Sequence, residues 1–185
     1  LVLLHGCGAD ADDLMPLGEE LMAALTVPAE CIGLQAPELH TSGYGRQWYE
    51  LFPADWKAVP SAIQQLHHRL EKLDLERIPL FRTVLIGFSQ GGAMALHVGC
   101  KLPLAGVISC SGYSHLGWEP PSSRPPVLLL HGRQDDVVPA AAANELLDLL
   151  SRGANPCCLK TFSGGHSIPE EAQNAMKESI GSWLQ

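Results

Sequence analysis

The sequence has few basic residues, no long hydrophobic run and no C-x-x-C pair. Its 185 residues include 12 Lys and Arg against 20 Asp and Glu, which gives a formal net charge of −8 at pH 7. Such a chain lacks the basic face that nucleic-acid phosphates require, and its charge disfavours tight docking on anionic membranes. We therefore expect no nucleic-acid partner. Since the sequence also has no run of about 18 apolar residues, we expect no integral membrane association.

The cysteines also lack the spacing of a metal site. Without a C-x-x-C pair, a zinc site is not expected, and nothing indicates another metal or a cofactor. The first residues lack the charged n-region and cleavage site of a signal peptide. We therefore expect reduced thiols and a cytoplasmic protein. The six cysteines are Cys7, Cys31, Cys100, Cys110, Cys157 and Cys158.

The overall composition is typical of a globular protein. Hydrophobic residues make up 46% of the chain and charged residues 17%, which fits one folded domain over residues 1–185. The apolar run Leu1–Leu4 is typical of a buried strand, yet no residue precedes it. Because a core strand seldom starts a chain, we expect that one or more N-terminal edge strands are missing.

Apolar runs alternate with helical patterns along the chain. This order predicts an α/β fold with a mostly parallel sheet that is covered by helices on both faces. Residues 38–54, with Gly43, Gly45 and Pro53, are expected to form a long loop. Strands are expected at 1–4, 31–34, 83–87, 105–110, 127–131 and 158–162, and helices at 12–25, 63–73 (with residue 60 in the first turn), 93–102, 140–150 and 170–184.

The strongest local signal is Gly87-Phe88-Ser89-Gln90-Gly91. It matches the G-x-S-x-G nucleophile elbow, in which a strand turns sharply into a helix and presents a strained serine. Small residues are needed at positions 87 and 91, two residues before and after the serine, because a bulky side chain there would clash with the turn. An apolar strand pattern precedes the motif and a small-residue helix pattern follows it. Ser89 is therefore the predicted nucleophile.

A serine nucleophile needs a base, and we expect it to be His166. In hydrolases with this elbow the order is serine, then acid, then histidine. His166 follows two glycines, after the last expected strand and before the last expected helix. His97 falls within the elbow helix and His131 at a strand end, so both are interpreted as structural. His115, in a loop, is a weaker alternative to His166.

The acid that orients the base should follow the strand at 127–131. Asp135 and Asp136 are both candidates, and spacing alone does not separate them. One of them would face the histidine, while the other could cap the helix that follows Pro139.

An oxyanion formed at Ser89 would need backbone N–H donors. We expect one from Gln90, the residue after the nucleophile, and a second from the loop His5–Gly8, with Cys7 as the candidate. An alternative makes Cys7 itself the nucleophile, but Ser89 already supplies that function.

These motifs, taken together and in order, resemble the phospholipase/carboxylesterase family, which includes acyl-protein thioesterases and small carboxylesterases. The resemblance implies an α/β-hydrolase fold without a large cap domain. It also implies that Asp135, four residues before Pro139, is the acid, and that Cys7 and Gln90 form the oxyanion hole. Trp48 would line the substrate pocket, with ordinary aromatic packing as the alternative. The segments that carry the resemblance are 4–8, 35–37, 48–49, 87–92, 131–139 and 164–166.

The predicted function is metal-free hydrolysis of carboxylic esters by Ser89, Asp135 and His166. The alternatives are acyl-protein thioesterase or lysophospholipase activity, and a binding module that keeps the fold without the reaction. A small ester or acyl compound is the expected substrate. An apolar strip beside the site would suit a lipid chain or a homodimer equally well.

Overall fold

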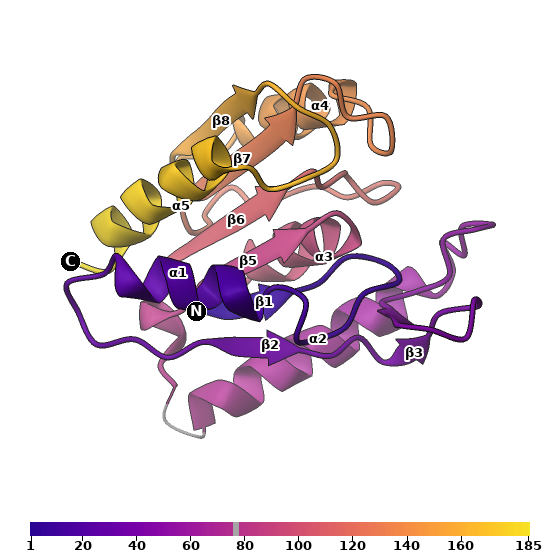
Figure 1. Ribbon diagram of the computed structural model, residues 1–185, viewed down its shortest axis with the longest axis horizontal. Helices are drawn as coiled ribbons and strands as arrows, with labels where there is room; N and C mark the ends of the chain where they lie inside the picture. The colour runs from indigo at the N-terminus through magenta and orange to yellow at the C-terminus, as the bar shows by residue number, and fades with distance from the viewer. Residues whose placement is uncertain (76–77) are drawn as a thin grey trace.

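Six parallel strands form the central sheet of the computed structural model, which describes residues 1–75 and 78–185 (Figure 1). Their order across the sheet is β2-β1-β5-β6-β7-β8, and each neighbouring pair is parallel. Parallel neighbours need long crossover connections, which the helices supply. The strands are β1 (Val2–Leu4), β2 (Ile32–Leu34), β5 (Val84–Phe88), β6 (Gly106–Cys110), β7 (Val127–Gly132) and β8 (Cys157–Phe162).

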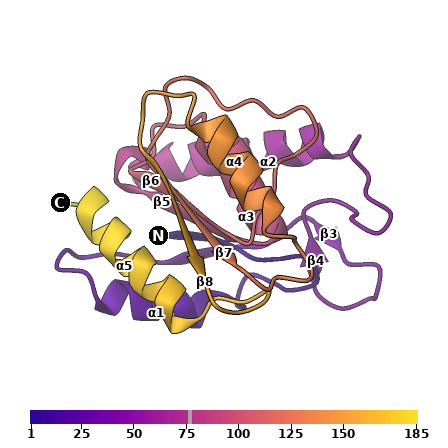
Figure 2. The same ribbon diagram turned by 90° about the horizontal axis from the view of Figure 1, so that it is seen from above.

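Helices cover the sheet on both faces, as Figure 2 shows from above. On one face lie α1 (Met15–Ala23) and α5 (Glu170–Trp183). On the other face lie α2 (Val59–Leu75), α3 (Gln90–Gly99) and α4 (Ala141–Leu150). The predicted α/β class, with a mostly parallel sheet between two helical layers, is confirmed.

The two layers enclose two separate hydrophobic cores. Leu85 points into the core shared with α2 and α3, whereas its neighbours Val84 and Ile86 point into the core shared with α1 and α5. All three side chains are at most 1% exposed. Burial on both faces explains why the central strands are continuous apolar runs instead of alternating patterns.

The segment expected to be one long loop contains a short hairpin, so that prediction was wrong in part. Its strands are β3 (Glu38–Leu39) and β4 (Arg46–Gln47), which pair antiparallel. Two backbone hydrogen bonds join the hairpin to the loop after β1, from the Gly8 N–H to the Arg46 carbonyl (2.8 Å) and from the Arg46 N–H to the Ala9 carbonyl (2.7 Å). The hairpin therefore supports the loop that was expected to bind an oxyanion.

The other boundaries differ from the predictions by a few residues. The elbow helix begins at Gln90 instead of Ala93, directly after Ser89. A 3-10 helix, η1 (Leu80–Arg82), precedes β5 and was not predicted. Among the described residues, no helix combines the length and the apolar character needed to cross a bilayer.

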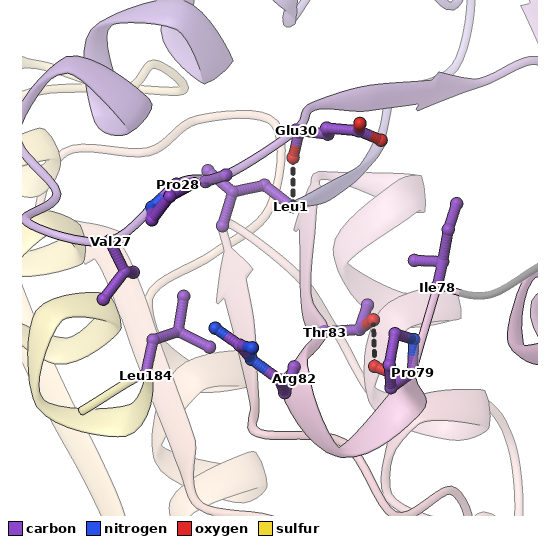
Figure 3. Close-up of a pocket in the computed structure, with 10 residues that line it drawn as sticks. Leu1, Val27, Pro28, Glu30, Ile78, Pro79, Arg82, Thr83 and Leu184 are labelled. Carbon is purple, nitrogen blue, oxygen red and sulfur yellow. Dashed lines mark hydrogen bonds between the residues drawn. The ribbon is translucent and has the colours of Figure 1, made fainter.

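The two ends of the sheet differ in chemistry. Ser89, Asp135 and His166 follow β5, β7 and β8, so they lie at the carboxyl ends of the strands. A cavity of about 690 Å³ lies at the opposite, amino end, between Leu1, Pro28, Arg82 and neighbouring residues (Figure 3). Open parallel sheets bind ligands at the carboxyl ends of their strands, which favours the end that carries Ser89, Asp135 and His166 over this cavity.

Candidate active site

Ser89 occupies a strained turn between β5 and α3. Its backbone has φ 53° and ψ −119°, in a region that L-residues rarely adopt. A Cβ atom on Gly87 would collide with the Gly91 carbonyl, and one on Gly91 would collide with the Leu4 carbonyl. These contacts are the physical reason for the two glycines of the motif. The Ser89 N–H donates to the Cys110 carbonyl (2.9 Å), which fixes the turn against β6.

His166 and Asp135 lie together, although 31 residues separate them. The His166 Nδ1 atom is 2.8 Å from the Asp135 Oδ2 atom. The ring of His166 packs on the ring of Phe88, with 4.8 Å between centroids, which places it beside the residue that precedes Ser89. Asp136, the other candidate acid, is exposed to solvent.

Hydrogen bonds hold the Asp135 carboxyl in its charged form. Its Oδ1 atom accepts the N–H groups of Val137 (3.0 Å) and Val138 (2.9 Å). Burial raises the pKa of Asp135, but these bonds and the bond from His166 outweigh burial and hold the pKa below its usual 3.8. A carboxylate is an acceptor only, so His166 Nδ1 must carry the proton. Nε2 of His166 is then the nitrogen that can accept one.

Two further side chains lie close to Asp135. Ser111, directly after β6, is fully buried with φ 50°, and its hydroxyl also lowers the pKa of Asp135. His131 Nε2 lies 2.8 Å from the Val138 carbonyl and 3.5 Å from Asp135 Oδ2. Because both neighbours are acceptors, this nitrogen carries a proton. His131, interpreted from the sequence as structural, thus anchors the loop that presents the acid.

The loop after β1 passes directly over the elbow. A Cβ atom on Gly6 would lie 3.4 Å from the Phe88 ring and 3.5 Å from the Ser89 Cβ. His5 holds the start of this loop: its Nδ1–H donates to the Gly6 carbonyl (2.7 Å), and its Nε2 accepts the Ala36 N–H (3.1 Å). Burial lowers the pKa of His5, which agrees with this neutral form.

Gln90 and Cys7 are the two candidates for oxyanion donors: Gln90 directly follows Ser89, and Cys7 follows Gly6, which lies against Ser89. Gln90 is the first residue of α3, and the first N–H groups of a helix have no partner within the helix. Cys7 is partly exposed in the loop that covers Ser89. Burial raises the pKa of the Cys7 thiol, and the negative charge of Glu50 adds to this effect. A thiol with a raised pKa yields little thiolate, which disfavours Cys7 as a nucleophile.

Trp48 lies in the core beneath the site. It is 1% exposed, which leaves almost none of its surface for a substrate. Its indole N–H donates to the His5 carbonyl (3.0 Å), and its backbone N–H donates to the Gln90 Oε1 atom (3.0 Å). The structure thus brings Trp48 to the site through hydrogen bonds, whereas its expected contact with substrate stays a prediction.

A buried chain of polar side chains beside the site was not foreseen. The Tyr49 hydroxyl lies 2.7 Å from the Tyr113 hydroxyl and 2.8 Å from His115 Nε2, and His115 Nδ1 lies 2.9 Å from His97 Nδ1. Burial lowers the pKa of His97 to about 4 and that of His115 to about 3, so both rings are neutral near pH 7. No sequence signal marks this hydrogen-bonded group of side chains, because its members come from three separate segments of the sequence.

Known proteins share the sequence pattern and the fold of this chain. The family model described as Phospholipase/Carboxylesterase matches residues 1–184. The chain belongs to this family. It is 30% identical over 155 residues to acyl-protein thioesterase 1 of Neurospora crassa, a match that covers 72% of this chain and 63% of that protein. It is also 30% identical over 142 residues to a probable carboxylesterase of Oryza sativa subsp. japonica, covering 72% and 52% of the two chains.

A solved structure also shows the fold of this phospholipase/carboxylesterase family member. The crystal structure of esterase PE8 superposes with a TM-score of 0.90 at 30% identity, over 99% of this chain and 91% of that one. The chain spans between about half and two thirds of the length of the two curated relatives named above. The family resemblance expected from the motifs is therefore confirmed, while the functions of individual residues stay predictions.

Proposed function

We propose that this protein is a serine hydrolase that cleaves carboxylic esters through an acyl-enzyme on Ser89. One observation carries the proposal: a charged Asp135 holds His166 Nδ1 at 2.8 Å, and the His166 ring packs on Phe88, the residue before a serine held at positive φ on a strand–helix turn. A lone serine hydroxyl is a weak nucleophile, and this pair supplies the base that it needs.

The proposed reaction has two halves. In the first, Nε2 of His166 takes the Ser89 proton as the oxygen attacks the acyl carbon, and the same proton then passes to the leaving alcohol or thiol. In the second, water attacks the acyl-enzyme with His166 again as base, and the acid is released. Asp135 keeps His166 in the required tautomer and stabilises its cation. The N–H groups of Cys7 and Gln90 would bind the oxyanion in both halves.

A thioester substrate is the second candidate. It is favoured by the match to an acyl-protein thioesterase, whereas the matches to a probable carboxylesterase and to esterase PE8 favour oxygen esters. The same residues serve both reactions, because the acyl-enzyme is identical and only the leaving atom differs. Paired oxygen and thio esters of one acyl group, measured over increasing chain length, would separate carboxylesterase, thioesterase and lysophospholipase activities.

A cytoplasmic location and a homodimer belong to the proposal as well. Cell fractionation would test the location, and sedimentation would test the oligomeric state.

The test of the proposal is hydrolysis of p-nitrophenyl esters by the protein and by the Ser89→Ala variant. The proposal predicts turnover by the former and background rates with the latter. Full activity in Ser89→Ala would exclude Ser89 as the nucleophile. A folded protein that neither turns over esters nor reacts with a fluorophosphonate probe would favour the binding-module alternative.

A further inference from the structure

Trp48 has two N–H groups, and each is bound to a different half of the proposed oxyanion hole. The indole N–H donates to the carbonyl of His5, 43 residues away, and the backbone N–H donates to the side chain of Gln90, 42 residues away. Both distances are 3.0 Å and both bonds are buried. Buried hydrogen bonds of this kind are strong in effect because water cannot replace either partner.

The first bond acts on the loop that carries Cys7. The His5 carbonyl belongs to the peptide that opens this loop, and the His5 ring lies 5.8 Å from the ring of Trp48. The same histidine is held on its other side by the Ala36 N–H, which donates to Nε2 (3.1 Å). The start of the loop is therefore fixed from the segment after β2 and from Trp48 together, which restricts the direction in which the Cys7 N–H can point.

The second bond acts on the helix start that carries the Gln90 N–H. The Gln90 side chain is fully buried. Its Oε1 accepts the Trp48 N–H, and its Nε2 donates to the Tyr49 carbonyl (2.8 Å). Residues 48 and 49 thus bind both ends of one amide group. With its side chain held in this way, Gln90 has little freedom to turn its backbone N–H away from Ser89.

We propose that Trp48 is a positioning residue that sets the separation of the two oxyanion donors, Cys7 N–H and Gln90 N–H. The inference rests on the proposed function, since it assigns these donors to the reaction of Ser89. The donors lie on different elements, and Trp48 binds a residue of each: the carbonyl of His5, two residues before Cys7, and the side chain of Gln90. Donors in a preorganised site lose most of their effect when they are displaced from the oxyanion, so a tether between them acts on the transition state more than on bound substrate.

The matched experiment compares Trp48→Phe with Trp118→Phe. Trp118 is also a buried tryptophan, 6% exposed, but its indole N–H has no hydrogen-bond partner among the residues that the structure describes, so its replacement by Phe is a control for lost packing alone. Four quantities are measured for each variant and for the unmodified protein. They are kcat and KM on a p-nitrophenyl ester, the rate of labelling by a fluorophosphonate, and the affinity for a trifluoromethyl ketone, whose serine adduct places an oxyanion in the hole.

We expect Trp48→Phe to lower kcat by about 10- to 100-fold with KM within about twofold. Affinity for the ketone should fall in proportion to kcat. Trp118→Phe should stay within about threefold in every quantity. If Trp48→Phe does not fold, β-(3-benzothienyl)alanine at position 48 replaces the indole N–H by sulfur at nearly the same shape, with the same expected result.

Three results would overturn the inference. The first is equal behaviour of the variants at positions 48 and 118. The second is a rise in KM with kcat and ketone affinity preserved, which would place Trp48 in the substrate pocket. In the third, the unmodified protein neither turns over the ester nor reacts with the fluorophosphonate; this removes the proposed function together with the inference, and is distinct from the first two, in which the unmodified protein is active.

Discussion

His166 Nδ1 lies 2.8 Å from Asp135 Oδ2, across two loops that follow neighbouring strands. The Asp135 side chain is completely buried, and the other oxygen accepts two backbone N–H groups. The carboxylate therefore has one orientation, and it imposes one tautomer on the histidine. The proposed mechanism depends on this relationship, which distinguishes Asp135 from its exposed neighbour Asp136.

The two adjacent aspartates give a direct test of that relationship. Asp135→Asn should lower kcat by about 10³- to 10⁴-fold, because an amide can hold His166 in the wrong tautomer and cannot stabilise its cation. Asp136→Asn should change kcat by less than about threefold, since its side chain is in solvent. Steady-state kinetics on one ester measure both. Similar losses in the two variants would show that Asp135 has no special place in the reaction.

Cys7→Ala tests whether the loop after β1 stabilises the proposed oxyanion through its backbone N–H groups. The proposed donor is the N–H of residue 7, which alanine keeps, so kcat/KM should stay within about threefold of the unmodified value. The thiol lies 3.9 Å from Gln47 Oε1, a weak contact whose loss costs little. A loss as large as that of Ser89→Ala would instead make the thiol the reacting group.

The two neutral histidines His97 and His115 predict how the stability of the protein depends on pH. Burial holds the pKa of His97 at about 4 and that of His115 at about 3, below the ordinary 6.5. Between pH 6.5 and 4 the unfolded chain therefore binds protons that the folded chain does not, and stability falls as pH falls through this window. The slope of Tm against pH over this range should flatten in His97→Asn. The same change at His68, an exposed histidine, should leave the slope unaltered; equal slopes in all three proteins would contradict this account.

Arg124 is predicted to act on stability and not on the reaction. It is 4% exposed and donates to four carbonyls, among them Leu150 at the end of α4 (2.6 Å) and Asn155 (3.0 Å). Arg124→Met leaves these carbonyls without a charged donor, which should lower the free energy of unfolding by about 2–4 kcal/mol. Urea unfolding measures this change, with Arg133→Met, at an exposed site, as the control. Activity at 25 °C should persist; a selective loss of kcat in a stable Arg124→Met variant would refute a purely structural function.

Much of this fold could be predicted because its signals are local. Continuous apolar runs marked the central strands, and the strand before the Gly87–Gly91 motif was placed within one residue, because an elbow has its own steric requirements. The hairpin of β3 and β4 was missed since each strand has two residues, too few for any periodicity. The hairpin is held in place by hydrogen bonds to the loop after β1. These bonds join segments that are distant in the sequence, so local patterns do not reveal them.

The candidate site could be predicted where a motif specifies chemistry, but not where side chains meet across the fold. Ser89 and His166 are predicted from the elbow and from the order of elements. Residue spacing alone leaves Asp135 and Asp136 equivalent; the family resemblance favours Asp135, and the structure places the Asp135 carboxyl against His166. Trp48 is similar: an aromatic residue in a segment expected to be a loop suits a pocket wall or a core equally well. Its contacts with His5 and Gln90, more than 40 residues away in each direction, become visible only in the folded chain.

The most direct test of the account is covalent labelling by a fluorophosphonate, followed by mass spectrometry of the digested protein. Such a reagent reacts with an activated serine and not with an idle one, because the oxygen must lose its proton to a base as it attacks. The account predicts one adduct per chain, on the peptide that contains Ser89, and no adduct in Ser89→Ala. An adduct on any other residue, or an unlabelled Ser89 in the folded protein, would contradict it.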